Sequence, residues 1–327
     1  MSAQSQNPSS LVGIAFMCAG IVAVSFNDMM FKFLSGDYAL HQLVFIRSAI
    51  AVCFSLALVR FEGGFRLLKT GQPGLHALRC LLIVLANMTF YAALASLPLG
   101  EATALFFLAP LIITLLSVPV LGETVGPFRL GAVFVGFVGV LIMTRPWADA
   151  DAREAPFFIY MLPLLAATFY GSFQILTRKL GGTTRASVLA VYIQSGFLIV
   201  SLGFFLVAGD GRFGDGSTNE SIRFLLRAWV WPPQEDLALL GGLGLCTAIV
   251  GYSFSQAYRL SDAALVAPFE YLGLPLALFW GWIMFREWPD PVAFGGIALI
   301  LSSGLFIFLR ERALRHRVSR TRGLHGR

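Results

Sequence analysis

The feature that most constrains this chain is a series of apolar blocks, each close to the ~20 residues that a helix needs to cross a bilayer. Apolar and aromatic residues make up 57% of the chain and charged residues only 13%, whereas soluble domains run at about 45–50% and about 25%. The blocks lack the alternation of barrel strands, and lipid cannot satisfy an open backbone. The sequence therefore predicts an all-α membrane protein.

We expect ten transmembrane helices, joined mostly by short connections. Their predicted ranges are 11–33, 41–60, 75–96, 102–121, 127–145, 156–177, 187–208, 237–257, 263–285 and 291–309. The exceptional connection is 209–236, which is polar at first and then aromatic at Trp229 and Trp231. We expect this segment to form a loop on the membrane surface.

Lysine and arginine residues are distributed unevenly between the two sides of these helices. With the N-terminus inside, sixteen of the 24 lie on the inner side and eight on the outer side. Seven of the sixteen are arginines near the C-terminus: Arg310 and six arginines in the tail 311–327. The positive-inside rule then predicts that both termini are cytoplasmic. The net charge of +6 is explained by topology or by contact with anionic lipid, and we expect no nucleic-acid partner.

The two halves of the sequence resemble each other. The segment that starts at Ala93 matches the segment that starts at Ala257 in its pattern of apolar and special residues. Three pairs correspond at one constant offset: Glu123 with Glu287, Pro127 with Pro291, and Gly131 with Gly295. Because five helices per unit is an odd number, the second copy must enter the membrane from the opposite side. This predicts two inverted five-helix repeats, TM1–TM5 in 1–147 and TM6–TM10 in 156–310.

These motifs resemble the EamA repeat, which defines the drug/metabolite transporter (DMT) superfamily. The resemblance rests on Glu101 opening a helix, Pro110 within it, and the closing Leu121-Gly122-Glu123. The second copy departs from the pattern with Arg286 before Glu287, where glycine is usual. The resemblance covers nearly the whole chain and implies ten helices around a central cavity, with alternating access and no ATP. The stretch 266–271 is similar to a subgroup of bacterial carriers assigned to vitamins and S-adenosylmethionine.

Motifs for other kinds of chemistry are missing from the sequence. It contains no GxxxxGK[ST], HExxH or GxSxG motif and no histidine cluster, and its four cysteines form no CxxC. We therefore expect no nucleotide hydrolysis, no metal, no other cofactor and no enzymatic activity.

Charged residues inside spans are the first candidates for a site, because a central charge costs at least about 2.5–3.5 kcal/mol in a bilayer. Glu270 lies between Pro268 and Pro275, which should loosen its helix. It is a candidate substrate ligand or proton site, and a structural pair with a neighbouring Arg or Tyr is the alternative. Tyr271, which follows it, is a candidate for the same site. Arg47 could bind an anionic substrate group, pair with Glu270 or Asp28, or snorkel to the outer surface.

Asp28 precedes Lys32 by one helical turn, the favourable order for an ion pair within a helix. That pair is one interpretation, and a position of Asp28 in the cavity is the other. Four further acids lie at span boundaries, where a carboxylate can cap free N–H groups. We expect these to be structural: Glu101, Glu123, Asp262 and Glu287.

Tyrosine and amide side chains recur four residues apart on three predicted helices. The pairs are Asn87 with Tyr91, Tyr170 with Gln174, and Tyr252 with Gln256, and Gln194 stands alone in another span. Each could instead make a hydrogen bond between helices. As a set they predict a polar and aromatic cavity that binds substrate.

Together these features predict a secondary transporter that moves a small organic metabolite across the membrane by alternating access. An amino-acid-like, S-adenosylmethionine-like or riboflavin-like solute would suit a site with both charge signs. Coupling to a proton or a counter-solute is left open, as is a monomeric or dimeric state. The alternative is a membrane sensor or assembly factor that transports nothing, whose bundle centre would be packed solid.

Overall fold

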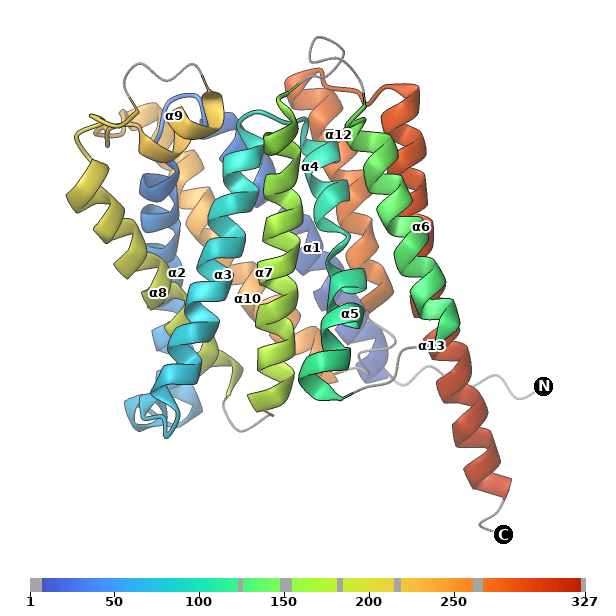
Figure 1. The fold of residues 1–327 in the computed structure, drawn as a ribbon. Coiled ribbons are helices and arrows are strands. Elements are labelled where there is room, and N and C mark those ends of the chain that lie inside the picture. The colour runs from blue at the N-terminus through green and yellow to red at the C-terminus, as the bar shows by residue number, and fades with distance from the viewer. Residues whose placement is uncertain are drawn as a thin grey trace.

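The computed structural model describes residues 8–122, 126–147, 155–180, 185–214, 219–260 and 267–324. Every regular element in these ranges is a helix (Figure 1), which confirms the all-α prediction. The α-helices are α1 (Pro8–Leu34), α2 (Leu40–Glu62), α3 (Pro73–Leu94), α4 (Leu99–Phe106), α5 (Ala109–Leu121), α6 (Pro127–Thr144), α7 (Phe157–Leu180), α8 (Ala186–Ala208), α9 (Glu220–Leu226), α10 (Leu237–Leu260), α12 (Gly273–Phe285) and α13 (Pro291–Leu324). Short 3₁₀ helices are η1 (Phe65–Leu68), η3 (Gln234–Asp236) and η4 (Ala267–Leu272).

Within the described ranges, seven helical segments are long and apolar enough to cross a membrane. Three shorter apolar helices lie at Leu130–Thr144, Phe269–Phe285 and Pro291–Phe306. The chain is therefore a multi-pass membrane protein.

Two helices that we expected to be continuous are interrupted. The predicted span 102–121 is divided into α4 and α5, and Pro110 lies in the first turn of α5. Proline fits there because the first-turn N–H groups have no partner within the helix, and it disfavours helical geometry in the residue before it. In the described part of the predicted span 263–285, the 3₁₀ segment η4 likewise precedes α12, and Pro268 lies within η4. Both interruptions lie beside the cavity described below.

The helices form one bundle in which early and late segments of the chain interleave (Figure 1). Helix α1 packs on α10 and α12, α2 packs on α8 and α10, and α3 packs on α7. Helices α6 and α13 pack on each other at one edge of the bundle. There the backbones nearly touch, because a Cβ atom added at Gly139 would lie 2.8 Å from the carbonyl oxygen of Gly296. The beginning of α1 and the end of α13 lie at the same end of the bundle.

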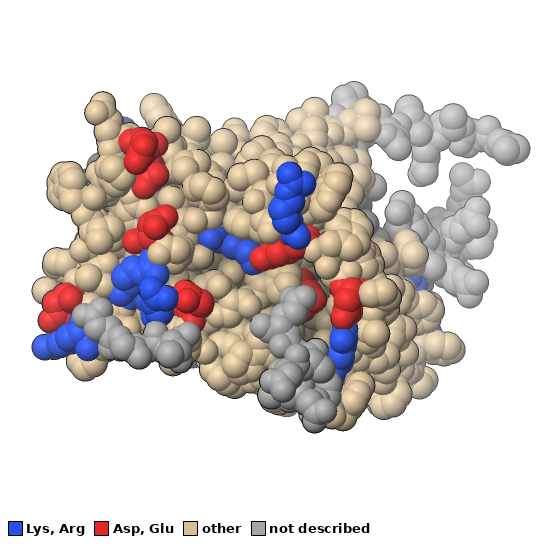
Figure 2. All heavy atoms as spheres, turned by 90° about the horizontal axis from the view of Figure 1, so that it is seen from above, with Lys and Arg blue, Asp and Glu red and all other residues tan. Residues whose placement is uncertain are grey.

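The opposite end carries α9 and mixed charges (Figure 2). Arg223 pairs with Glu220 at 2.9 Å, and Arg145 pairs with Asp290. Burial alone would raise the pKa of Asp290, but hydrogen bonds from Arg145 and from the N–H of Ala293 hold it below its usual value. The acids on this face are thus largely balanced by neighbouring cations.

The described parts of the connection 209–236 are folded onto this end. Gln42 holds the segment through both groups of its amide, donating to the Val230 carbonyl at 2.6 Å and accepting from the Val230 N–H at 3.1 Å. Trp229 packs on Phe205, with ring centroids 4.4 Å apart, whereas Trp231 is 95% exposed.

Candidate functional site

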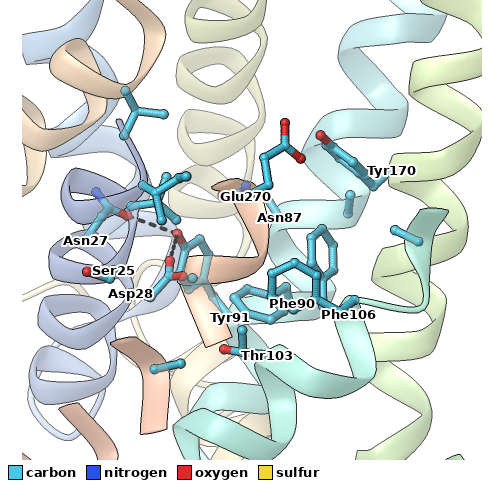
Figure 3. Close-up of a pocket in the computed structure, with 18 of the residues that line it drawn as sticks. Ser25, Asn27, Asp28, Asn87, Phe90, Tyr91, Thr103, Phe106, Tyr170 and Glu270 are labelled. Carbon is cyan, nitrogen blue, oxygen red and sulfur yellow. Dashed lines mark hydrogen bonds between the residues drawn. The ribbon is translucent and has the colours of Figure 1, made fainter. Parts of the chain in front are cut away.

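A cavity of about 370 Å³ lies inside the bundle (Figure 3). Its walls come from α1, α2, α3, α4, α5, α7, α8, α10 and α12, together with η4 and the turn between α4 and α5. Six of the eleven predicted site residues line it: Asp28, Arg47, Asn87, Tyr91, Tyr170 and Glu270. The centre of the bundle is therefore not packed solid, which disfavours the sensor or assembly-factor alternative.

Arg47 organises the polar side of the cavity. One guanidinium nitrogen, Nη1, donates to Asn27 Oδ1 and to Tyr91 Oη, each at 3.3 Å, and Nη2 donates to Asn87 Oδ1. Three aromatic faces surround the same group, with the Phe31 ring centroid 4.8 Å and the Phe197 ring centroid 5.3 Å from its central carbon. This guanidinium can persist here because hydrogen-bond acceptors and aromatic faces share its charge, and because the Asp28 carboxylate interacts with it electrostatically.

Two of the interpretations that we gave for Arg47 are wrong. Its side chain does not snorkel, because the residue is only 5% exposed. Among the described residues it makes no direct ion pair with Asp28 or Glu270. Its hydrogen-bond partners are neutral, and Asp28 interacts with it only electrostatically, beside the Tyr91 hydroxyl that both contact. Among the described residues, its Nε is buried and has no hydrogen-bond partner.

Asp28 belongs to this network and not to a pair with Lys32. Its Oδ1 lies 2.8 Å from Tyr91 Oη, which also lies 2.9 Å from Asn27 Oδ1. Both Asp28 and Lys32 are described, and no ion pair joins them. The ammonium of Lys32 lies 2.7 Å from Glu287 Oε1 instead. The helical-pair interpretation is therefore wrong, because α1 turns the two side chains toward different neighbours.

Glu287 has the structural role that we expected of it. Besides its ion pair with Lys32, its Oε2 accepts the N–H of Leu99 at 3.2 Å, in the first turn of α4. A carboxylate is stabilised there by the free N–H groups and the positive end of the helix dipole. The predictions for Glu123 and Asp262 fall outside the described residues.

The opposite wall is aromatic. Phe106 packs on Phe90 and on Tyr170, with ring centroids 5.1 and 5.4 Å away. The carboxyl group of Glu270 extends from η4 toward the hydroxyl of Tyr170 (Figure 3), and the two groups interact electrostatically. The cavity thus presents flat apolar faces beside a few polar groups.

Five predicted site residues do not line the cavity. Gln174 lies behind Tyr170 and donates to its hydroxyl at 2.8 Å, and Tyr271 stacks on Phe107 at 5.4 Å. Tyr252 is 43% exposed. Gln194, whose buried Oε1 has no partner among the described residues, and Gln256 also lie away from the cavity lining.

Sequence reasoning missed several residues that line the cavity. The polar ones include Thr103 and Thr247, and five phenylalanines complete the walls: Phe90, Phe106, Phe107, Phe197 and Phe254. Thr103 is 8% exposed, and its hydroxyl has no hydrogen-bond partner in the described structure. No signal distinguished it, because threonine is common in apolar helices and usually bonds a carbonyl of its own helix.

A helical bundle that spans the membrane around a central mixed cavity has the architecture of a membrane carrier. The sequence profile of the EamA-like transporter family matches residues 11–145. A riboflavin transporter from Rhizobium johnstonii is 33% identical over 301 residues, covering 92% of this chain and 89% of that protein. A riboflavin transporter from Vibrio cholerae is 32% identical, over 90% of this chain and 89% of that protein.

Relatives with another named substrate are also similar. An S-adenosylmethionine uptake transporter from Rickettsia prowazekii is 26% identical over 92% of this chain and 94% of that protein. A crystal structure of another protein shares the fold, with a TM-score of 0.58 at 18% identity, over 92% of this chain and 96% of that chain.

The chain belongs to the EamA-like transporter family, within the drug/metabolite transporter superfamily. The prediction of a carrier for a small metabolite is confirmed.

Proposed function

We propose that this carrier moves a flat, neutral heteroaromatic metabolite of the flavin class, with riboflavin as the first candidate. The observation that carries the proposal is the pairing of aromatic walls with a compact polar side in one cavity. Flat rings stack favourably on faces such as Phe90 and Phe106. The polar edge and hydroxylated chain of a flavin need donors and acceptors such as Arg47, Asn87 and Tyr91.

The size of the cavity supports this assignment. Its volume of about 370 Å³ lies within the range of about 300–1,000 Å³ that is usual for sites of drug-sized ligands. Two relatives named as riboflavin transporters are 33% and 32% identical to the chain.

S-adenosylmethionine is the second candidate, and the two acids in the cavity favour it. A sulfonium cation would be stabilised by Asp28 or Glu270, and its adenine ring could use the same aromatic wall. The relative that carries this substrate name is less similar, at 26% identity.

We infer that transport proceeds by alternating access between two inverted five-helix repeats, over 1–147 and 156–310. The packing pairs support this arrangement, because exchanging the halves maps the contact of α1 with α10 onto that of α7 with α3. The same exchange maps each of the pairs α2–α8 and α6–α13 onto itself. The two interrupted helices, α4–α5 and η4–α12, then occupy equivalent positions at the cavity, as discontinuous helices do in other transporters.

In the proposed orientation both termini and the tail 311–327 are cytoplasmic, and α9 faces the outside of a bacterial inner membrane. The five site residues that do not line the cavity in this conformation stay candidates for another step of the cycle.

The experiment that tests the substrate is a binding titration of the purified protein in nanodiscs. Stacking on aromatic rings should quench flavin fluorescence, and S-adenosylmethionine can be measured by calorimetry on the same sample. Quenching by riboflavin, and no heat with S-adenosylmethionine, is the expected result. Heat with S-adenosylmethionine alone would select the second candidate, and binding of neither would refute the flavin assignment.

The part played by Glu270 is tested separately by Glu270→Gln in proteoliposomes. We expect slower uptake and an altered pH dependence, since the substitution removes an ionisable group that faces the cavity. Uptake that matched the unmodified protein at every pH would exclude both a substrate and a proton role.

A further inference from the structure

A second hollow, of about 400 Å³, lies between α3 and α8. It faces outward, beside side chains that a membrane would surround: Leu78 is 45% exposed, Leu81 49% and Ile199 71%. Its floor is the close approach of the two helices, where a Cβ atom added at Gly196 would lie 3.1 Å from Cys80 Cβ. In a bilayer, the molecules that reach such a groove are lipids.

One polar group in this apolar groove is unsatisfied. His76 lines it and is 8% exposed, and its Nδ1 has no hydrogen-bond partner in the described structure. Its ring lies 5.0 Å from that of Tyr192 across the groove. A buried ring nitrogen without a partner is costly, and a polar headgroup at the mouth of the groove would provide one.

The mouth of the groove is basic. Thr70 lines the groove directly after Lys69, and Arg66 lies in η1, just before it. This basic segment is held in place, because Tyr192 of the groove donates its hydroxyl to the Leu68 carbonyl at 2.6 Å.

The stretch 63–84 contains no acidic residue. The nearest acid in the sequence, Glu62, accepts the hydroxyl of Ser187 at 2.7 Å. The charge at the mouth is therefore positive, in contrast to the mixed face that carries α9 (Figure 2).

We propose that the α3–α8 groove binds one anionic phospholipid, with an acyl chain along the groove and the phosphate at Arg66, Lys69 and His76. The basic mouth lies at the end of the bundle where α1 begins and α13 ends (Figure 1). Anionic lipids are attracted by basic residues close to the membrane surface. The site is separate from the central cavity, so it does not depend on the identity of the transported solute.

Native mass spectrometry of the purified full chain tests this site. The protein is titrated with phosphatidylglycerol and, separately, with phosphatidylcholine of matched acyl chains. We expect tighter retention of phosphatidylglycerol by the unmodified protein. Removing charge in the double variant Arg66→Gln with Lys69→Gln should weaken that preference by about fivefold for each side chain.

A substitution that fills the groove tests whether an acyl chain lies in it. Ala77→Phe places a ring in the groove and should reduce retention of both lipids. Its matched control is Ala57→Phe, at an exposed position on α2 outside the groove. Arg212→Gln, at the opposite end, is the control for charge removal. Both controls should behave like the unmodified protein.

Two results would overturn the proposal. One is equal retention of the two lipids by the unmodified protein, a comparison that needs no variant and so does not depend on whether the variants fold. The other is retention by Ala77→Phe that equals retention by Ala57→Phe.

Discussion

The hydroxyl of Thr103, which has no hydrogen-bond partner among the described residues, gives the sharpest test of the cavity as a binding site. Thr103→Val keeps the shape of the side chain and removes only the hydroxyl. If that hydroxyl bonds the solute, its loss should cost about 0.5–1.5 kcal/mol, which raises Kd between about twofold and tenfold. Thr103→Ser keeps the hydroxyl and should bind riboflavin nearly as the unmodified protein does.

Thr103→Val should not destabilise the protein when no ligand is bound. A buried donor without a partner costs about 1–3 kcal/mol, so Thr103→Val should be at least as stable as the unmodified protein before ligand is added. Weaker binding with undiminished stability separates a ligand contact from general damage to the fold.

Two assays on the same nanodisc sample check both effects: flavin fluorescence quenching for Kd, and thermal unfolding for stability. The matched control is Thr89→Val, because the hydroxyl of Thr89 already donates to the Leu85 carbonyl of its own helix, at 2.7 Å, outside the cavity. If Thr103→Val bound riboflavin with unchanged Kd, the hydroxyl would have no part in recognition and the reasoning would fail.

Three further predictions concern the framework around the cavity. Tyr91→Phe should lower the free energy of unfolding by about 1–3 kcal/mol, because it removes the hydroxyl beside the Asp28 carboxylate; a thermal unfolding temperature equal to that of the unmodified protein would contradict this. Gly139→Leu should destabilise the chain by at least about 1–3 kcal/mol, since any Cβ there meets the backbone of α13, whereas Gly131→Leu, which has open space, should not. Asp290→Asn should reduce the unfolding temperature slightly at neutral pH. The lowered pKa of Asp290 means that its charge stabilises the fold above its unfolded pKa of about 4, and that this contribution is lost as the pH falls through the lower folded pKa; a difference that did not shrink at acid pH would argue against the Arg145 ion pair as its cause.

The sequence identified the helices and the charged centre of the cavity because both depend on local composition. Arg47 stood out as a permanent charge within an apolar block, and Asn87 and Tyr91 as polar groups on one helix face. Tyr252 and Gln256 have the same spacing, but they do not line the cavity. The rotation of α10 decides that outcome, and it is set by packing on α1, where Phe254 fits against Gly20.

The sequence also could not predict which charged residues pair with each other. Lys32 bonds Glu287, which is far away in the sequence, and nothing in its own helix indicates this. The sequence also did not predict the interruption between α4 and α5. A proline in the first turn of a new helix cannot be distinguished by sequence from a proline that kinks a long helix.

The composition of the Arg47 network has a consequence for how the protein is made. The hydrogen-bond acceptors of Arg47 are Asn27 on α1 and Asn87 and Tyr91 on α3, so all of them belong to the first three helices. A buried arginine is expensive for a nascent chain to hold in lipid. Once α1, α2 and α3 are in the membrane together, both Nη atoms of that arginine already have their acceptors. The ribosome completes the remaining helices afterwards, and the cavity closes around a polar centre assembled early in synthesis.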